Sequence, residues 1–293
     1  MAIEVATIIV INTLLYTAIL TLVALGLNIV LGVLKILNQA HGIAMALGAY
    51  LVLTLTSLGL PLSRPLIVIV LLLAGLLGGI LFASVTAILM IRKLIYYEAI
   101  YVLLVTYSIM LIAEDIIKFI WGARSYVIGE VYPLFGTVSI AGISYPVYYF
   151  ILIIAASIIT ALTYIFIDYT PLGKMIRAVA SDRETAMALG VRGDMIYFSA
   201  YIVGCLLAGI GGALTAPLLT LQPGFSLEFL LMAFIVVVLT GLGEIKGLPI
   251  TAFIISLMRA VAVKFVPELE MAIPFLAMLI GLALRPQGLF GRG

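Results

Sequence analysis

The sequence predicts an all-α fold: a polytopic transmembrane helical bundle of about eight or nine spans, with one or two broken or re-entrant segments. Hydrophobic residues make up 65% of the 293 residues and charged residues only 10%, and the mean hydropathy is +1.36. A soluble domain is about half apolar and about a quarter charged. Because so few charges cannot cover a water-facing surface, the chain must face a lipid bilayer.

Runs of sequence without a charged residue define the candidate spans. A helix crosses the hydrocarbon core in about 20 residues, and the longest uncharged runs exceed that length: 5–34, 36–63, 65–91, 131–167 and 195–227. Shorter runs need their flanking residues to cross, or cross only in part. We expect spans near 6–33, 40–60, 65–91, 98–120, 146–167, 195–217, 228–243, 247–264 and 270–286.

The orientation follows from the lysines and arginines, which concentrate on the cytoplasmic side of membrane proteins. Nine spans put most of them on one side: Arg92, Lys93, Lys174, Arg177, Arg183, Arg192, Lys246, Arg285 and Arg292. The other side carries Arg64, Arg124, Lys264, Glu4, Glu130, Glu268 and Glu270. We therefore expect a multi-pass protein of the cell (plasma or inner) membrane, with its N-terminus outside and its C-terminus cytoplasmic.

Residues 1–293 form one predicted transmembrane domain, in which the long, charged cytoplasmic loop is 168–194. Its sequence is typical of short helices: Pro171 suits a first turn, Ser181 and Glu184 fit a capping box, and Gly190 can end a helix. Asp194 can cap the following span. Ala186, Leu189 and Val191 offer a small apolar patch. Either this loop docks into another protein, or it lies on anionic lipid headgroups.

A dense polar cluster separates the first two expected spans. Asn38, Gln39 and His41, the single histidine, precede Gly42, and Asn28 lies about two turns before Lys35. Polar groups at membrane depth are costly unless paired, and broken backbone there is found where it lines a cavity. The cluster is therefore either part of a solute pathway or a cytoplasmic turn in which His41 caps the second span.

Small residues recur every four positions in the sixth expected span. Gly204, Ala208 and Gly212 form a ridge on one helix face, and such ridges allow helices in membranes to approach closely. Gly75 and Gly79 have the same spacing in the third span. A second glycine-rich break, 240–249, is either a cytoplasmic hairpin or a break that pairs with the first polar cluster, and its Glu244 and Lys246 can screen each other.

Sequence features of several other classes are missing. No Gly-x-x-x-x-Gly-Lys-Ser/Thr phosphate loop and no His-Glu-x-x-His zinc motif is present. A metal site is disfavoured because His41 has no second histidine beside it and Cys205 is the only cysteine. A net charge of +2 gives no reason to expect nucleic acid. We therefore expect no enzyme, no catalytic residue and no bound cofactor or metal in this chain.

Three regions together resemble the Liv-type (LivH-like) branched-chain amino-acid permeases of ABC importers. The first is 24–42 with Gly48 to Tyr50, where the family characteristically has Asn-Phe-Ala-His-Gly. The second is Pro171-Leu-Gly-Lys-Met-Ile-Arg-Ala-Val-Ala-Ser-Asp182, followed by Glu184-Thr-Ala-Met-Ala-Leu-Gly190. The third is Gly241-Leu-Gly243 with Gly247 and the tail Leu284-Arg-Pro-Gln-Gly-Leu-Phe-Gly291. Their order and spacing extend over nearly the whole chain.

The resemblance implies a permease subunit for branched-chain amino acids or a related small polar solute, such as an amide or urea. Its implied partners are two cytoplasmic ABC ATPases that use the ATP, a second homologous permease or an identical copy, and an extracytoplasmic solute-binding protein. It implies that the ATPases grip the loop through Gly173, Arg177, Asp182, Glu184, Ala186 and Gly190. It favours Asn28, Asn38, Gln39, His41 and Gly42 as pathway residues.

Some residues depart from the family pattern. Gln39 replaces the usual aromatic ring, Thr240 stands where glycine is common, and Glu244 and Lys246 bring charge to a normally neutral turn. The solute can therefore differ from branched-chain amino acids. Two other classes stay open on the residues alone: a secondary transporter or channel for a small solute, for which the membrane interior offers few acids, and a structural membrane scaffold.

Overall fold

The computed structural model describes residues 2–59, 63–92, 97–129 and 131–291. Within them the chain is a helical bundle, which confirms the predicted fold class. Lys93, Glu130 and Arg292, which contributed to the orientation argument, lie outside the described residues. The α-helices are α1 Ala2–Leu34, α2 His41–Ser57, α3 Arg64–Arg92, α4 Ala99–Trp121, α5 Val147–Tyr169, α6 Pro171–Ser181, α7 Arg183–Ala188, α8 Gly193–Thr215, α9 Phe225–Thr240, α10 Leu248–Phe265 and α11 Ala272–Leu284.

Every predicted span is a helix, with bounds within a few residues of those expected. Six helices are long and apolar enough to cross a membrane by themselves: α1, α3, α4, α5, α8 and α10. The apolar helices α2, α9 and α11 are shorter, with 17, 16 and 13 residues. At 1.5 Å per residue these fall short of about 30 Å of hydrocarbon. They need other elements to complete a crossing.

Two small β-pairings, which the sequence did not predict, lie outside the helices. The strands β2 Thr137–Ile140 and β3 Ile143–Pro146 form an antiparallel hairpin in which Ile140 faces Ile143. The strands β1 Tyr126–Val127 and β4 Thr220–Leu221 also pair antiparallel, although they are far apart in sequence. Short 3-10 turns occupy Tyr132–Phe135, Ala216–Leu218 and Pro267–Leu269. These elements lie in loops between the apolar helices, so the bundle itself stays helical.

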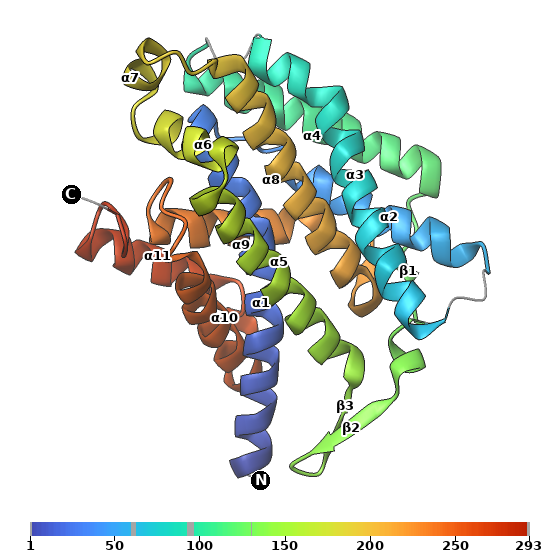
Figure 1. Ribbon diagram of the computed structural model, residues 1–293. Helices are drawn as coiled ribbons and strands as arrows, with labels where there is room; N and C mark the ends of the chain where they lie inside the picture. Colours follow the sequence, from blue (N-terminus) through green and yellow to red (C-terminus); the bar gives the residue numbers. More distant parts are fainter. Residues whose placement is uncertain (1, 60–62, 93–96, 130, 292–293) are drawn as a thin grey trace.

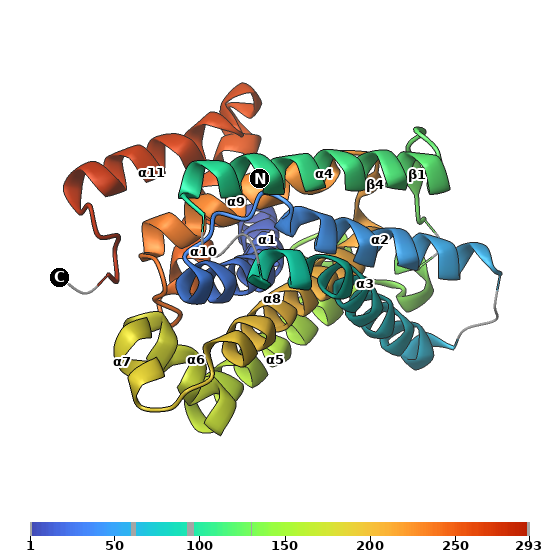
Figure 2. The ribbon, with the colours of Figure 1, turned by 90° about the horizontal axis from the view of Figure 1, so that it is seen from above.

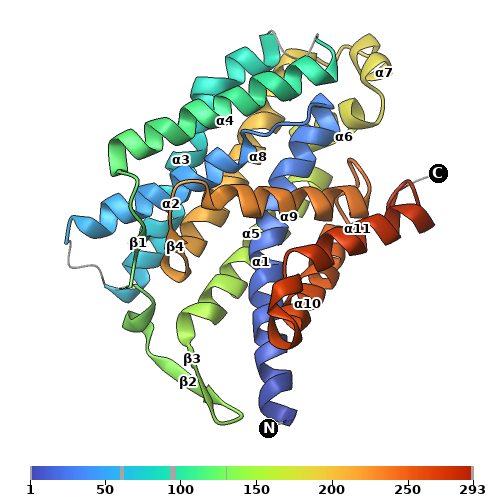
Figure 3. The same ribbon diagram turned by 180° about the vertical axis from the view of Figure 1, so that it is seen from behind.

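The two ends of the bundle carry different elements. In Figure 1 the short helices α6 and α7 lie at the top, together with the C-terminal ends of α1, α3 and α5 and the start of α8. The N-terminus and the β2–β3 hairpin lie at the bottom. Seen from behind, α10 and α11 form a pair beside α1, and α4 lies on the outside of the bundle (Figure 3). The hairpin and the 168–194 loop are therefore at opposite ends.

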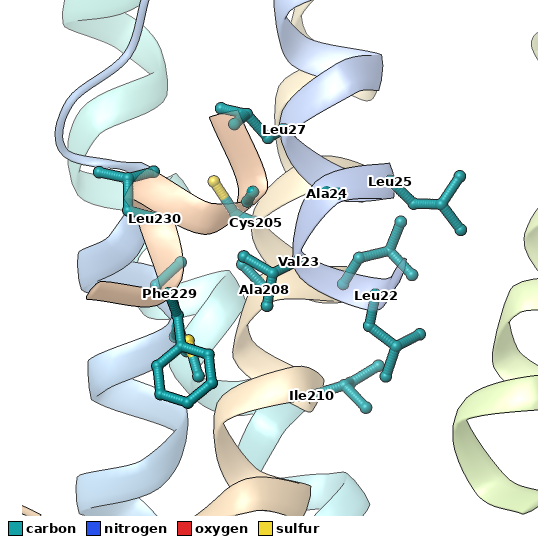
Figure 4. Close-up of a cluster of buried hydrophobic side chains, with 14 of the residues drawn as sticks. Leu22, Val23, Ala24, Leu25, Leu27, Cys205, Ala208, Ile210, Phe229 and Leu230 are labelled. Atoms are coloured by element: carbon teal, nitrogen blue, oxygen red, sulfur yellow. The ribbon is translucent and has the colours of Figure 1, made fainter. Parts of the chain in front are cut away.

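Helix α8 is the centre of the fold. It crosses the middle of the bundle in Figure 2 and packs against α1, α2 and α3, whereas α4 and α11 lie at the periphery. Figure 4 shows its Cys205, Ala208 and Ile210 packed with leucines and Val23 of α1 and with Phe229 and Leu230 of α9. The side chains of Cys205, Ala208 and Leu230 are fully buried. The core thus joins the first and last thirds of the sequence around one helix.

Glycines on α8 bring three neighbouring helices to backbone contact. Gly204 meets the backbone of Gly26 on α1, and Gly212 meets the carbonyl of Met45 on α2. On α3, a Cβ placed on Gly75 would lie 2.5 Å from Cα of Ile210. Ala208 lies fully buried between the two α8 glycines. The helices therefore touch through their main chains, which is the arrangement that small-residue spacing permits in membranes.

Candidate functional site

The 168–194 loop folds into two short helices at one end of the bundle. Thr170 caps α6, because its hydroxyl accepts a hydrogen bond from the N–H of Gly173 at 3.0 Å, and Pro171 occupies the first turn as expected. Gly173, Ile176 and Val179 are buried against the bundle. A Cβ on Gly173 would collide with the backbone of Phe166 and Ile167 at the end of α5. Helix α6 is therefore fixed to α5, and α7 is the outer part of the loop.

Helix α7 begins with a different cap from the one predicted. Asp182, not Ser181, is the N-cap: its Oδ1 accepts from the N–H of Thr185 at 3.0 Å, and its Oδ2 accepts from the Thr185 hydroxyl at 2.6 Å. The Ser181–Glu184 capping box is therefore wrong, because α6 runs through Ser181. Hydrogen bonds from the Thr185 hydroxyl and N–H hold the pKa of Asp182 below its ordinary value.

Replacing Asp182 by alanine is expected to fray α7, because a six-residue helix depends strongly on its caps. The measurement is hydrogen exchange of the α7 amides, Thr185 above all, in the purified protein. Since the pKa of Asp182 is lowered by folding, the capping contribution is complete above the ordinary aspartate pKa and is lost only as the pH falls below it. We therefore expect no change in α7 exchange protection across neutral pH.

The matched control is Asp182→Asn, because asparagine is an equally good N-cap acceptor. It should retain the protection of α7 that the alanine variant loses. Equal exchange rates in the alanine and asparagine variants would contradict a capping role.

The end of α7 is closed by a Schellman motif. Gly190 has φ +90°, its N–H bonds the carbonyl of Met187 at 3.0 Å, and the N–H of Val191 bonds the carbonyl of Ala186 at 3.1 Å. This is the left-handed glycine cap predicted from the sequence. A Cβ on Gly190 would meet no atom within 4 Å. The conformation, and not crowding, is what requires glycine here.

The apolar surface of α7 differs from the predicted patch. Ala186 is buried against the chain, whereas Leu189 is 81% exposed and Met187 is exposed as well. Glu184 is exposed on the same helix. The capped helix thus presents a leucine, a methionine and an acid to the outside of the chain. The expectation that Ala186 contributes to that surface is corrected.

The next helix also begins differently from the prediction. Helix α8 starts at Gly193 with Arg192 at its N-cap position, and no side chain makes a capping hydrogen bond there. Asp194, predicted as the cap, lies inside the first turn. There its charge still favours the positive end of the helix dipole.

A cavity of about 620 Å³ separates α6 from the loop between α9 and α10. Its lining includes Asn28 of α1, Tyr164 and Asp168 of α5, Arg177 of α6, and Glu244 and Lys246 of the α9–α10 loop. Gly291 of the C-terminal tail lines it too. The tail and the 168–194 loop are therefore at the same end of the molecule.

Arg177 is engaged inside the chain. Its Nη1 lies 2.5 Å from Oδ1 of Asp168, and Nη2 donates to the main-chain carbonyl of Asp168 at 3.4 Å. Lys246 Nζ approaches the other carboxylate oxygen of Asp168 at 3.7 Å. The expected screening of Lys246 by Glu244 is thus corrected: only the backbone N–H of Lys246 contacts Glu244, at 3.1 Å, and its ammonium pairs with Asp168.

The glycine-rich break is a short turn that pairs with α1. Asn28 donates from Nδ2 to the carbonyl of Glu244 at 2.8 Å and accepts from the N–H of Gly243 at 3.0 Å. The C-terminal tail adds hydrogen bonds from Leu289 and Phe290 to the last carbonyls of α9, at 2.7 and 2.9 Å. The motif regions near Asn28, 240–247 and the tail, widely separated in sequence, therefore meet.

The polar cluster lies inside the protein. The non-helical residues 35–40 interrupt the bundle, and Thr106 of α4 holds them through the N–H of Gln39 and the carbonyl of Leu37. Asn38 and His41 are fully buried, Gln39 is half-buried, and Gly42 packs on Ser226 of α9. The cluster does not line the 620 Å³ cavity, whereas Asn28 does.

His41 does not cap α2 as one alternative predicted. The N-cap residue is Ala40, with no side-chain capping bond, and Asn38 Oδ1 accepts the N–H of Ala40 at 3.0 Å instead. The His41 ring lies against α1 at Gly26. The described residues contain no group of three or more His, Cys, Asp or Glu side chains able to hold a metal. The pathway role of Asn38, Gln39 and His41 stays a prediction.

Sequence reasoning missed a charged cluster at α10. Arg259 is buried, and its Nη2 lies 2.9 Å from Glu228 at the start of α9 and 2.5 Å from Glu270 just before α11. Its guanidinium lies 4.0 Å from the ring centroid of Tyr16 on α1. An ionisable residue inside an apolar helix indicates that a group of opposite charge or a polar group lies beside it. That signal was available in the sequence, but its partners come from three other segments.

Comparisons with known proteins place the chain in a family. The profile described as "Branched-chain amino acid transport system / permease component" matches residues 9–282. The chain belongs to this family. The permease is 25% identical over 289 residues to the high-affinity branched-chain amino acid transport system permease protein LivH of Salmonella typhimurium, with 92% of this chain and 91% of the relative covered.

Two further relatives agree with that assignment. LivH of Escherichia coli K12 is 24% identical over 289 residues, and BraD of Pseudomonas aeruginosa, also a high-affinity branched-chain amino acid transport system permease protein, is 22% identical over 280 residues. Each alignment covers 92% of this permease and 91% of the relative. No solved structure matches the chain significantly.

Proposed function

We propose that this permease forms the membrane pathway of an ABC importer for branched-chain amino acids or a related small polar solute. The observation that carries the proposal is α7. It is a short helix capped at both ends by Asp182 and Gly190, and it presents Leu189, Met187 and Glu184 outward. A six-residue helix buries little apolar surface within its own chain. An exposed leucine on a helix that is capped at both ends is therefore suited to pack into an apolar pocket of another protein.

The proposed division of labour assigns ATP hydrolysis to other subunits. Two cytoplasmic ATPases dock on the 168–194 loops of two permeases, which are either identical or homologous, and an extracytoplasmic binding protein delivers the solute. The support for this assembly is the family membership of the chain together with the exposed α7. ATP binding closes the ATPases, α7 moves with them, and the spans change their access from one side of the membrane to the other.

The proposed orientation puts α7 in the cytoplasm. Basic residues concentrate in the 168–194 loop, which the positive-inside rule assigns to that side. The C-terminal tail shares a cavity with this loop, so it is cytoplasmic as well. The N-terminus is at the other end of the 33-residue helix α1 and is therefore outside. On this proposal the protein is a multi-pass protein of the inner membrane.

The solute class rests on the relatives, whose names specify branched-chain amino acids. Gln39 and Asn38 supply amide groups beside His41, and polar groups of this kind also suit an amide or urea. We place the pathway near these residues because unwound backbone at 35–40 interrupts the helices there. Uptake assays with labelled leucine, valine, short amides and urea, in the presence of the cognate binding protein, separate these solutes.

Two changes at α7 are expected to uncouple ATP use from transport. Gly190→Val forces a β-branched residue into φ +90°, which costs on the order of 1–2 kcal/mol and reshapes the end of α7. Glu184→Lys reverses an exposed charge on the proposed docking surface. The measurement is ATPase stimulation by loaded binding protein in proteoliposomes that contain the complete complex. We expect stimulation to fall about tenfold in both variants.

The control for backbone strain is Gly136→Val. Gly136 has φ +77° and equally open space around its Cβ, but it lies next to β2 at the opposite end of the bundle. It should leave stimulation intact. Wild-type stimulation in both α7 variants would overturn the docking assignment, and robust solute flux by the purified chain alone under an ion gradient would favour a secondary transporter.

A further inference from the structure

The α9–α10 loop, residues 241–247, is bound by several separate parts of the permease. Asn28 of α1 holds the backbone of Gly243 and Glu244, and the hydroxyl of Tyr164 on α5 donates to the carbonyl of Ile245 at 2.8 Å. The ring of Phe290 in the C-terminal tail lies against Gly247. A movement of this loop must therefore move α1 and α5 with it or break these hydrogen bonds.

The same loop has an ionic connection to the 168–194 loop through one carboxylate. Oδ1 of Asp168 lies 2.5 Å from Nη1 of Arg177 on α6, and Oδ2 lies 3.7 Å from Nζ of Lys246 on the α9–α10 loop. The Asp168 side chain is 26% exposed, whereas that of Lys246 is 73% exposed. Asp168 is thus the least exposed member of the trio, and each cation contacts a different oxygen of its carboxylate.

The cavity makes this connection mechanically important. Residues of α6 line one part of its wall and residues 242–246 line another, so the space between them is not filled by packed side chains. A direct push from α6 on the α9–α10 loop across this cavity therefore has no packed side chains to pass through. Within the described part of the chain, the ion pairs that join these two elements both involve Asp168.

Folding stability does not explain the trio well. Ion pairs with exposed partners typically contribute about 0–1 kcal/mol, because water screens them and the side chains lose freedom. Arg177 and Lys246 are 43% and 73% exposed. Removing the pairs should therefore change the folded state little. Their geometry matters for the relative position of two elements that otherwise face each other across a cavity.

We propose that Asp168 is a positioning residue that transmits movement of the 168–194 loop to the α9–α10 loop, and through Asn28 to α1. The proposal rests on the docking of ATPases at α7. When α6 moves with the ATPase, Arg177 moves Asp168, and Lys246 follows the carboxylate. The α9–α10 loop then shifts against Asn28, so the push reaches the span that leads into the polar cluster.

The test measures coupling in the complete complex with Asp168→Asn and Lys246→Met. Both remove the Asp168–Lys246 attraction, and the second acts at an exposed side chain whose loss does not threaten folding. We expect basal ATPase activity and melting temperature to stay at the wild-type level, while stimulation by loaded binding protein falls about fivefold, the lower end of typical coupling between sites. Lys246→Arg should restore stimulation, because it keeps the cation.

The double variant distinguishes a shared contact from independent effects. If Asp168 and Lys246 act through one ion pair, the double variant is no worse than the more severe single variant. If the fold losses of stimulation in the two single variants multiply in the double variant, the relay is overturned. The matched control is Asp115→Asn, which breaks an ion pair of 2.9 Å with Lys118 near the far end of α4. It should leave stimulation unchanged, and a loss as large as that of Asp168→Asn would also overturn the relay.

Failure of the relay can be told apart from failure of the proposed function. If Gly190→Val uncouples the complex but Asp168→Asn and Lys246→Met do not, the relay is overturned and ATPase docking at α7 stands. If the ATPases do not copurify with the wild-type permease, or Gly190→Val couples normally, docking at α7 is overturned and the relay with it.

Discussion

Replacing Arg259 by methionine is expected to destabilise the folded permease by about 3 kcal/mol, the largest effect we predict for a single charged residue. The Arg259 side chain is only 7% exposed, and it holds Glu228 and Glu270 from two other segments. Its removal leaves two carboxylates side by side without a cation. Since these carboxylates are 40% and 33% exposed, water offsets part of the penalty, and the expected cost lies at the lower end of the usual range of about 3–5 kcal/mol.

The stacking of the guanidinium on Tyr16 adds to this loss, because a cation over an aromatic ring at 4.0 Å contributes about 1 kcal/mol or more when desolvated. The measurement is thermal or denaturant unfolding of the detergent-purified permease. Lys264→Met is the matched control, because Lys264 is an exposed base on the same helix and should cost little.

A compensated variant separates the charge from the packing. Arg259→Met combined with Glu228→Gln and Glu270→Gln removes all three charges, and it should recover much of the lost stability, since neutral replacements of a buried ion cluster are tolerated better than a broken one. An unchanged unfolding midpoint for Arg259→Met alone would show that the three charges do not hold α9, α10 and the start of α11 together.

Placing one methyl group on Gly212 is expected to prevent correct packing of the bundle. The Cβ of Gly212→Ala would overlap the main-chain carbonyl of Met45 on α2, and main-chain atoms cannot rotate away as a side chain does. Overpacking of cores typically costs about 1–3 kcal/mol, and a backbone collision lies at or above the upper end of that range. We expect low yields of folded protein and loss of uptake, measured by size-exclusion profile and transport assay.

The adjacent glycine provides the control. A Cβ on Gly211 would lie 3.2 Å from the Val23 side chain, which can adjust by a few tenths of an ångström. Gly211→Ala should therefore fold and transport, and it adds the same methyl group to the same helix. Normal yield and uptake from Gly212→Ala would mean that α2 and α8 are not held in main-chain contact.

The long apolar helices could be read from the sequence because a mostly uncharged run at membrane depth must satisfy its backbone hydrogen bonds internally. Both bounds of α3, and the C-terminal ends of α1 and α5, follow from where charges interrupt those runs. The strand pairs β1–β4 and β2–β3 could not be predicted in this way. They are short, they lie between helices, and β1 pairs with a segment more than ninety residues away.

Within the loop at 168–194, the features that depend only on neighbouring residues could be predicted. The glycine cap at Gly190 and the proline at Pro171 depend on neighbouring residues alone, and both stand as expected. The choice between Ser181 and Asp182 as the N-cap of α7 could not be predicted. Helix α6 continues through Ser181, so the adjacent Asp182 caps α7 instead. The partners of Asp168 and Arg259 come from distant segments, and a single sequence does not specify such pairings.

Where α8 contacts its three neighbours through main-chain atoms, no side chains lie between the helices that could repack if one helix slid along another. A helix that meets α1 at Gly26, α2 at Gly48 and Met45, and α3 at Gly75 can neither rotate nor shift along its axis without separating from all of them. These four helices are therefore expected to move as one unit, so a push that reaches α1 through Asn28 carries α2, α3 and α8 with it.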